Sequence, residues 1–149
     1  VTGLLLPETT VEATRRRMTA RFPGAATSTP PQFVQQTISA VTSLLAGDAV
    51  DLASVVLDMD GVPEFHRRVY DVARTIPVGA TTTYGDIARR LGEPGASRAV
   101  GQALGRNPFV LIVPCHRVLA AGGRAGGFSA PGGTATKFNL LAREGAQLF

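Results

Sequence analysis

The chain of 149 residues is long enough to form one domain with a buried core, and it needs no disulfide to hold it. Hydrophobic residues make up 44% of the chain and charged residues 17%, a balance that excludes a disordered protein. The net charge is +4, and the single cysteine, Cys115, excludes an internal disulfide and a cysteine-rich zinc site. Because there are only two histidines, we also expect no His-rich metal centre.

The sequence predicts a soluble, cytoplasmic protein with no membrane partner. No apolar run approaches the roughly 20 residues that a membrane-spanning helix needs. Val1–Thr10 lacks the basic start and the long apolar stretch of a signal peptide.

The positive charge is concentrated in the second part of the chain. Residues 1–64 carry four arginines and seven acidic residues, a net charge of −3, whereas residues 65–149 carry a net charge of +7. This asymmetry favours a polyanionic partner for the second part, such as nucleic acid. Fourteen of the fifteen basic residues are arginines, which a high-GC coding bias would explain equally well.

The fold class predicted from the elements is α+β, with residues 1–61 forming a small N-terminal scaffold lobe of a sheet and a helix. Gln32–Ala46 has apolar residues at helical spacing, and Gly47 ends the predicted helix. Ser54–Asp60 has the pattern of a short strand. Arg15–Arg17 could bind phosphate, but a solvated face of an early strand or helix is the favoured interpretation.

Residues 62–149 are predicted to form a second, mostly helical domain. The apolar spacing predicts a helix over Pro63–Thr75. Thr83 can cap a second short helix, and Ser97 can cap a third over Arg98–Gly105. Two short helices joined by a tight, glycine-containing turn form a helix-turn-helix pattern.

The third of these helices has unusually small side chains after Arg98. Ala99, Gly101, Ala103 and Gly105 leave almost no bulk, although glycine inside a helix costs about 0.5–1 kcal/mol relative to alanine. Close packing against another helix would explain the pattern. Close approach to a narrow DNA minor groove would explain it equally well.

Cys115 follows an apolar segment, Phe109–Val113, that has the character of a buried strand. A lone cysteine after such a strand is more often an inert core residue than a nucleophile. Here Pro114 stops the strand, and two polar residues, His116 and Arg117, follow the cysteine. Lowering the pKa of a thiol requires polar groups packed against it, and these two residues could provide them. A reactive cysteine is therefore a competing hypothesis.

His116 is the candidate base for this cysteine. Neighbouring side chains of an extended segment point to opposite faces, so the proton would pass through a bridging water or the chain would have to turn after Pro114. A third group must orient the imidazole, and after Glu93 the only acidic residue is Glu144. Glu144 has two interpretations: it is an exposed acidic residue of a helix, or it is the partner of His116.

The second part of the chain resembles the O6-alkylguanine-DNA alkyltransferases, also called methylated-DNA–protein-cysteine methyltransferases. The resemblance extends from Phe65 to Gly145 and includes IPVGATTTYGDIARRLG, SRAVGQALGRNPFVLIVPCHRV, GGFSAPGG and KFNLLAREG in order. The PCHRV segment at Pro114–Val118 resembles the active-site motif of that family. Several ordered motifs are more specific than any one of them.

The resemblance implies that Cys115 accepts an alkyl group from the O6 atom of a flipped guanine, with His116 as the water-mediated base and Glu144 as its partner. It also implies that Tyr84 donates a hydrogen bond to the guanine and that Asn107 holds the active-site segment. The expected partner is double-stranded DNA that contains O6-alkylguanine, with O4-alkylthymine left open as a second lesion.

The resemblance gives further residues a place at the DNA and around the base. Arg98 would fill the gap that the flipped nucleotide leaves, and Thr83, Ala99 and Gly101 would lie against the DNA. The expected pocket lining is Leu104, Val118, Phe128 and Ser129. The reaction needs no cofactor because a thiolate attacks a saturated carbon unaided. We expect a monomer that acts once, and cooperative binding to DNA is left open.

Two alternatives to a repair protein share part of this pattern. A noncatalytic module could bind flipped alkylated bases and recruit partners without transfer, and the reactivity of Cys115 separates it from a repair protein. A cysteine hydrolase built on Cys115 and His116 is disfavoured because no helix is predicted to begin at the cysteine.

Overall fold

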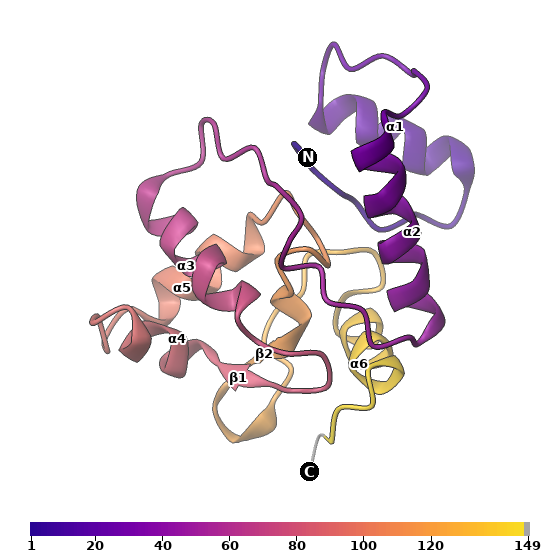
Figure 1. Cartoon of the computed structure of the whole chain (residues 1–149). Coiled ribbons are helices and arrows are strands. Elements are labelled where there is room, and N and C mark those ends of the chain that lie inside the picture. The colour runs from indigo at the N-terminus through magenta and orange to yellow at the C-terminus, as the bar shows by residue number, and fades with distance from the viewer. Residues whose placement is uncertain (148–149) are drawn as a thin grey trace.

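The computed structural model describes residues 1–147 and has a mixed α+β architecture, which confirms the predicted fold class. Figure 1 shows the two N-terminal helices on one side of the molecule and a group of three helices on the other. In chain order the elements are α1 (Val11–Arg21), α2 (Gln32–Ala46), α3 (Glu64–Arg74), β1 (Thr82–Thr83), α4 (Tyr84–Arg90), α5 (Ser97–Gly105), the 3₁₀ turn η1 (Cys115–Arg117), β2 (Val118–Leu119), the 3₁₀ turn η2 (Ala121–Gly123) and α6 (Gly133–Arg143). No helix among the described residues is long and apolar enough to cross a membrane.

The N-terminal region contains two helices instead of the predicted sheet and helix. α2 has the predicted bounds, and Gly47 closes it with a left-handed backbone (φ 104°) that glycine adopts without strain. Arg15–Arg17 lie on α1, none of whose residues is buried, which agrees with the expected solvated face. The division of the chain at residues 61 and 62 stays a prediction, since Leu6, Leu44 and Leu52 belong to the same hydrophobic core as the later helices.

The predicted strand at Ser54–Asp60 is wrong. Within residues 1–147, the paired strands are β1 and β2 of the second part of the chain. The segment at residues 53–58 finds other partners, because the Arg74 guanidinium donates to the carbonyls of Ala53 and Val55 at 2.6 and 2.7 Å. Val56 is 81% exposed, so the alternation of apolar residues here does not reflect a buried sheet face.

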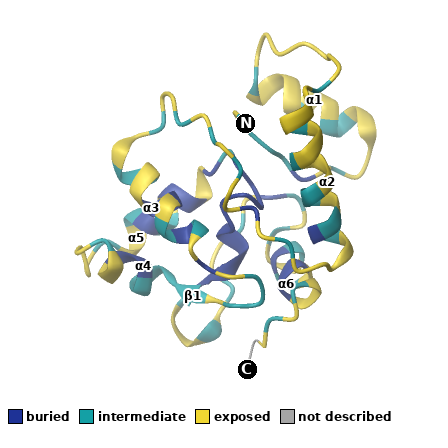
Figure 2. Cartoon of the chain, viewed as in Figure 1, coloured by how far each residue is buried: buried dark blue, intermediate teal, exposed yellow. Residues whose placement is uncertain are grey.

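The helices α3, α4 and α5 pack together around fully buried side chains. The ribbon of the buried residues is dark blue in Figure 2. Tyr70 of α3 donates its buried hydroxyl to the carbonyl of Ala103 in α5 at 2.9 Å. Close packing against another helix is confirmed at Ala103, and the approach of DNA to α5 stays a prediction. Ala103 lets α3 approach closely, whereas Gly101 faces an open cavity and Gly105 has open space beside its Cα.

The start of α4 is fixed by a reciprocal cap, as the sequence predicts for Thr83. The Thr83 hydroxyl accepts from the Asp86 amide, and the Asp86 carboxylate accepts from the Thr83 amide, each at 3.1 Å. The predicted cap at Ser97 is wrong, because α5 begins one residue earlier than expected. Ser97 is inside α5, and Ala96 precedes it with no side-chain cap.

This difference between the two helix starts predicts different losses of stability. We expect Thr83→Ala to lower the free energy of unfolding by about 1 kcal/mol, the usual cost of a lost N-cap. Ser97→Ala removes a hydroxyl that caps nothing, so its effect should stay within about 0.5 kcal/mol. Urea unfolding of both variants measures this, and equal losses would contradict the assignment of the caps.

The segment before the cysteine is buried as predicted, but it is a turn and not a regular strand. Phe109 bridges to Leu4, and Val110 bridges to Val113 within the same turn. The Val113 amide donates to the Phe109 carbonyl at 2.8 Å, and Leu111 has a positive φ of 73°. Beyond this turn β2 pairs in parallel with β1, Thr82 opposite Val118, so the cysteine lies beside the start of α4.

Candidate active site

Cys115 lies at the wall of a large open cavity. The cavity has a volume of about 1060 Å³ and lies between the first turn of α4, one face of α5 and the glycine-rich loop after β2, residues 120–129. Cys115 is 7% exposed, and its residue is part of the cavity lining. The thiol is therefore buried against the core on one side and reachable from the cavity on the other.

The neighbours of Cys115 contact its sulfur but leave the thiol protonated. Asn107 donates from Nδ2 to the Cys115 Sγ at 3.6 Å and to the Val113 carbonyl at 2.9 Å. Burial raises the pKa of the Cys115 thiol, while the Asn107 hydrogen bond and the charge of Lys137 act in the opposite direction. The expected lowering of this pKa is therefore wrong for the resting protein, because desolvation is the largest effect.

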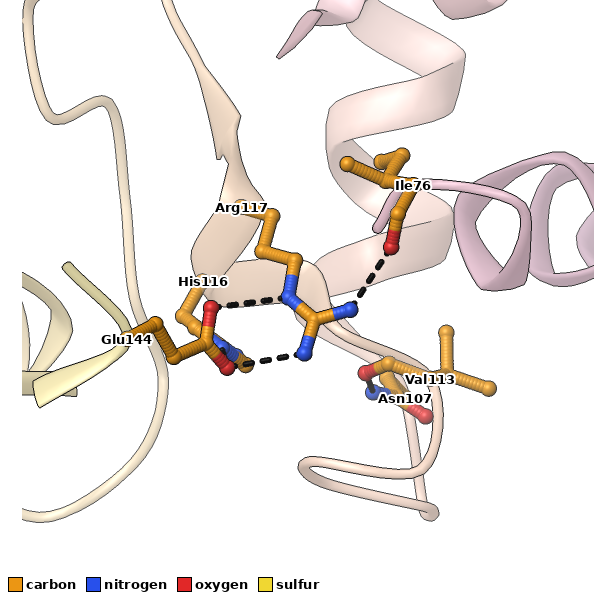
Figure 3. Close-up of polar contacts among 6 residues, drawn as sticks. All are labelled: Ile76, Asn107, Val113, His116, Arg117 and Glu144. Carbon is orange, nitrogen blue, oxygen red and sulfur yellow. Dashed lines mark hydrogen bonds and ion pairs between the residues drawn. The ribbon is translucent and has the colours of Figure 1, made fainter. Parts of the chain in front are cut away.

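His116 and Glu144 lie together, as the scarcity of acidic residues in this region predicts (Figure 3). The His116 Nε2 lies 2.9 Å from the Glu144 Oε1, and the two side chains are 0% and 3% exposed. Glu144 caps the C-terminal end of α6, and His116 belongs to η1. The interpretation of Glu144 as an exposed helix acid is wrong.

Arg117 binds the other side of the same carboxylate. Its Nε donates to the Glu144 Oε2 at 2.9 Å, and its Nη2 donates to the Oε1 at 2.8 Å. Its Nη1 donates to the carbonyl of Ile76 at 2.6 Å, which joins the end of α3 to the site. Such a bidentate ion pair fixes the plane of the carboxylate and keeps the carboxylate ionised. These hydrogen bonds, together with that of His116, lower the pKa of Glu144 to about 2.

His116 has one ring nitrogen that no group among residues 1–147 satisfies. Its Nδ1 is buried without a hydrogen-bond partner, while Nε2 faces Glu144. A carboxylate only accepts, so we assign the ring proton to Nε2, which leaves a lone pair on Nδ1. Burial lowers the pKa of His116, so the ring is neutral at pH 7 and able to accept a proton at Nδ1.

Tyr84 lies across the cavity and is held by the glycine-rich loop. Its hydroxyl donates to the Gly127 carbonyl at 3.4 Å, and burial raises its pKa, so the phenol remains a hydrogen-bond donor at neutral pH. Gly126 has a φ of 64°, and a Cβ there would lie 2.8 Å from the Tyr84 ring. A side chain at that position would therefore displace the tyrosine.

A family model for the DNA-binding domain of 6-O-methylguanine DNA methyltransferase matches residues 64–146. The chain belongs to this family. It is 43% identical over 121 residues to the methylated-DNA–protein-cysteine methyltransferase of Methanothermobacter thermautotrophicus. That match includes 81% of this chain and 66% of the relative, so the chain spans about two thirds of the relative's length.

Solved structures of the family have the same arrangement of elements. The crystal structure of Mycobacterium tuberculosis OGT in complex with DNA has a TM-score of 0.68 and 41% identity, covering 74% of this chain and 66% of that one. The O6-methylguanine-DNA methyltransferase of the hyperthermophilic archaeon Pyrococcus kodakaraensis has a TM-score of 0.75 and 28% identity, covering 98% and 86%.

Eight of the thirteen predicted site residues line the cavity, and five do not: Asn107, His116, Glu144, Val118 and Ala99. Asn107 contacts the Cys115 sulfur, and His116 pairs with Glu144. Val118 is fully buried because it pairs in β2, and Ala99 is half-buried on α5 away from the lining residues. The cavity is lined by the predicted residues Thr83, Tyr84, Arg98, Gly101, Leu104, Cys115, Phe128 and Ser129.

The site contains two buried cations, Arg117 and Lys137. Sequence reasoning treated Arg117 only as a polar neighbour of the thiol and gave no role to Lys137. Lys137 is fully buried, and its Nζ donates to the Val118 carbonyl at 2.6 Å and to the Gly127 carbonyl at 3.4 Å. The same nitrogen lies 5.7 Å from the centre of the Tyr84 ring. Lys137 thereby ties the cysteine segment to the loop that closes the cavity. The sequence feature that could have drawn attention to Lys137 is that it is the only lysine of the chain.

The buried His116–Glu144 pair predicts a loss of stability in acid. The pKa of Glu144 is lowered to about 2 and that of His116 is also lowered, so the unfolded chain binds more protons than the folded one in acid. The free energy of unfolding should therefore be flat near pH 7, begin to fall below about pH 6.5 and continue to fall toward pH 2.

Urea unfolding between pH 8 and pH 3 measures this dependence. The matched control is Glu144→Gln, which lacks the titrating carboxylate and should show a shallower slope below pH 4.5. Identical slopes for the two proteins in that range would contradict the assignment of the depressed pKa to Glu144.

Proposed function

We propose that this chain repairs O6-alkylguanine in double-stranded DNA by moving the alkyl group irreversibly to the sulfur of Cys115. The observation that carries the proposal is the placement of a reachable thiol at the wall of a cavity large enough to admit a base. The thiol lies next to a buried His116 whose Nδ1 has no partner among residues 1–147 and is able to accept a proton. The names of the relatives and the DNA-bound solved structure support this function.

The first step of the proposed reaction is the loss of the thiol proton. Cys115 begins the 3₁₀ turn and His116 follows it within the same turn. We assign the transfer of the proton from Sγ to Nδ1 to one bridging water. Glu144 then stabilises the imidazolium through Nε2, and Arg117 holds Glu144 in place. The proton leaves only as the reaction begins, since the resting thiol is neutral.

The second step forms the bond from sulfur to the alkyl carbon and breaks the bond from that carbon to guanine O6. The sulfur attacks the alkyl carbon as the bond from that carbon to guanine O6 breaks, and the electron pair goes to the guanine. The guanine takes up one proton, which balances the proton lost by the thiol. Tyr84 is the phenol that faces the cavity, and we assign it the hydrogen bond to the departing base. Lys137 and Asn107 stabilise the negative sulfur.

The product is a thioether that this chain has no means to cleave. A second thiol would be needed to displace the alkyl group, and Cys115 is the only cysteine of the sequence. Water does not hydrolyse a thioether at neutral pH. The protein therefore acts once, which separates this proposal from a cysteine hydrolase even though a 3₁₀ turn begins at Cys115.

The DNA would bind along α4 and α5, with residues 62–149 as the DNA-binding and alkyl-acceptor part. Thr83 and Arg98 line the cavity near the starts of these helices, and Gly101 opens a path for the backbone of the DNA. Ala99 presents a small side chain on the same helix. Arg98 is exposed and would enter the duplex where the damaged nucleotide leaves it.

The role of Arg98 predicts a difference between two substrates. Arg98→Ala should slow repair of O6-methylguanine in duplex DNA by roughly 10²-fold, because a flipped base costs a few kcal/mol of stacking and pairing. Its effect on the free base O6-benzylguanine should be small, since a free base needs no flipping. Equal losses on the two substrates, measured as transfer rates, would contradict the role.

The experiment that tests the proposed function is incubation with duplex DNA that contains one O6-methylguanine. We expect the intact protein mass to rise by one methyl group and the modified peptide to contain Cys115. The same duplex with guanine should leave the mass unchanged. Tight binding to the lesion with no mass change would instead establish the noncatalytic sensing module.

A further inference from the structure

A second cavity lies where α1 meets the C-terminal end of α5. Its volume is about 620 Å³, and it is lined by the side chains of three arginines and by no carboxylate among the described residues. We call it the junction groove and define it by Arg17 and Arg21 of α1, Gly105 and Arg106 after the helix-turn-helix, and Ser129 of the glycine-rich loop.

Two of the three arginines of the junction groove are available to a ligand. Arg17 binds the Glu8 carboxylate at 2.8 Å at the edge of the groove. Arg21 and Arg106 are exposed, and neither side chain makes an ion pair or hydrogen bond within residues 1–147. Burial raises the pKa of Tyr70 to about 12, and the charges of both Arg21 and Arg106 oppose that rise. Both arginines line the same cavity.

The junction groove continues the candidate active site along α5. Gly105 and Ser129 line both cavities, so the two lie next to each other. Arg98 lies near the start of α5 and Arg106 directly after its end, a separation of about 12 Å at 1.5 Å of rise per residue. One DNA strand carries a phosphate every ~3.4 Å of helix axis, so this distance spans three to four nucleotides.

We propose that the junction groove binds backbone phosphates of the DNA strand that enters the active site. Guanidinium groups bind phosphate oxygens with two parallel hydrogen bonds, and a concave site without carboxylates suits an anion. The inference rests on the proposed function. It also gives the N-terminal part of the chain a share in DNA binding through Arg21, beyond the expected role of a scaffold.

The test is the salt dependence of binding to an undamaged duplex by the full chain. Each phosphate that an arginine neutralises contributes about 0.9 to the slope of log affinity against log salt. Arg21→Ala and Arg106→Ala should each reduce the slope by about that amount, and the double variant by about twice it. Near physiological salt each single substitution should weaken binding roughly fivefold.

The matched control is Arg16→Ala, which removes the same charge from α1 but lies outside the junction groove. Its slope should equal that of the unmodified protein. The inference is overturned if Arg21→Ala and Arg106→Ala leave the slope unchanged, or if Arg16→Ala reduces it equally, since that would reveal general charge attraction.

Transfer from a free base distinguishes failure of this inference from failure of the proposed function. The Arg21→Ala/Arg106→Ala variant should react with O6-benzylguanine as fast as the unmodified protein. If the arginine variants change the slope but the unmodified protein never alkylates Cys115, phosphate binding by the junction groove is supported and the repair function is contradicted. If Cys115 is alkylated but the variants leave the slope unchanged, the repair function is supported and the junction groove is contradicted.

Discussion

Cys115→Ser should bind DNA that contains O6-methylguanine and transfer no methyl group at all. The substitution changes one atom at the wall of the cavity and leaves the His116–Glu144 pair and the lining of the pocket intact. A serine hydroxyl ionises far less readily than a thiol, and the neutral imidazole of His116, to which we assign the proton, is too weak a base to deprotonate it. Binding by gel shift and intact mass after incubation measure the two effects separately.

Ser39→Ala is the control for this comparison, because Ser39 is exposed on α2 and lies outside both cavities. It should bind and transfer like the unmodified protein. Methyl transfer by Cys115→Ser at a rate within tenfold of the unmodified protein would show that the sulfur is not the acceptor.

Glu144→Ala should cost roughly 3–5 kcal/mol of folding stability, the usual penalty when one partner of a buried ion pair is removed. The substitution leaves the Arg117 guanidinium, whose side chain is 8% exposed, without its carboxylate and removes the partner of His116. The loss is large for a protein of this size, whose total stability is on the order of 5–15 kcal/mol. Urea unfolding at pH 7 measures it.

The exposed pair of Arg68 and Glu93 provides the control. Its side chains are 43% and 45% exposed, so Glu93→Ala should change stability by less than about 1 kcal/mol. If Glu144→Ala fails to fold, a double-mutant cycle of Arg117→Met and Glu144→Gln gives the same information through its coupling energy. Additivity of those two substitutions within about 0.5 kcal/mol would contradict a coupled buried cluster.

Helices whose ends are set by nearby residues follow from the sequence, and segments that need distant partners do not. Gly47 caps the C-terminal end of α2, and Thr83 caps the N-terminal end of α4, so the sequence near each helix end determines where it lies. Ser54–Asp60 has a strand pattern, but the Arg74 side chain of α3 donates hydrogen bonds to the carbonyls of Ala53 and Val55, and the segment pairs with no strand among the described residues. Phe109–Val113 is buried as expected, yet Leu4 and its own turn satisfy its backbone.

The candidate site follows the same rule. The pairing of His116 with Glu144 could be predicted because the region contains almost no other acidic residue. The neutral thiol could not be predicted from its polar neighbours, because its depth in the fold determines the desolvation. The burial of Arg117 and Lys137 depends on carbonyls of Ile76 and Val118, which no local pattern identifies.

The central claim is that one sulfur atom takes the alkyl group and keeps it. The most direct measurement is a titration of the protein with an excess of duplex that contains radiolabelled O6-methylguanine, followed to completion. The account predicts a plateau of one methyl group per molecule of active protein, all of it on Cys115. Repaired lesions that outnumber the protein molecules, or a plateau at zero with intact lesion binding, would contradict it.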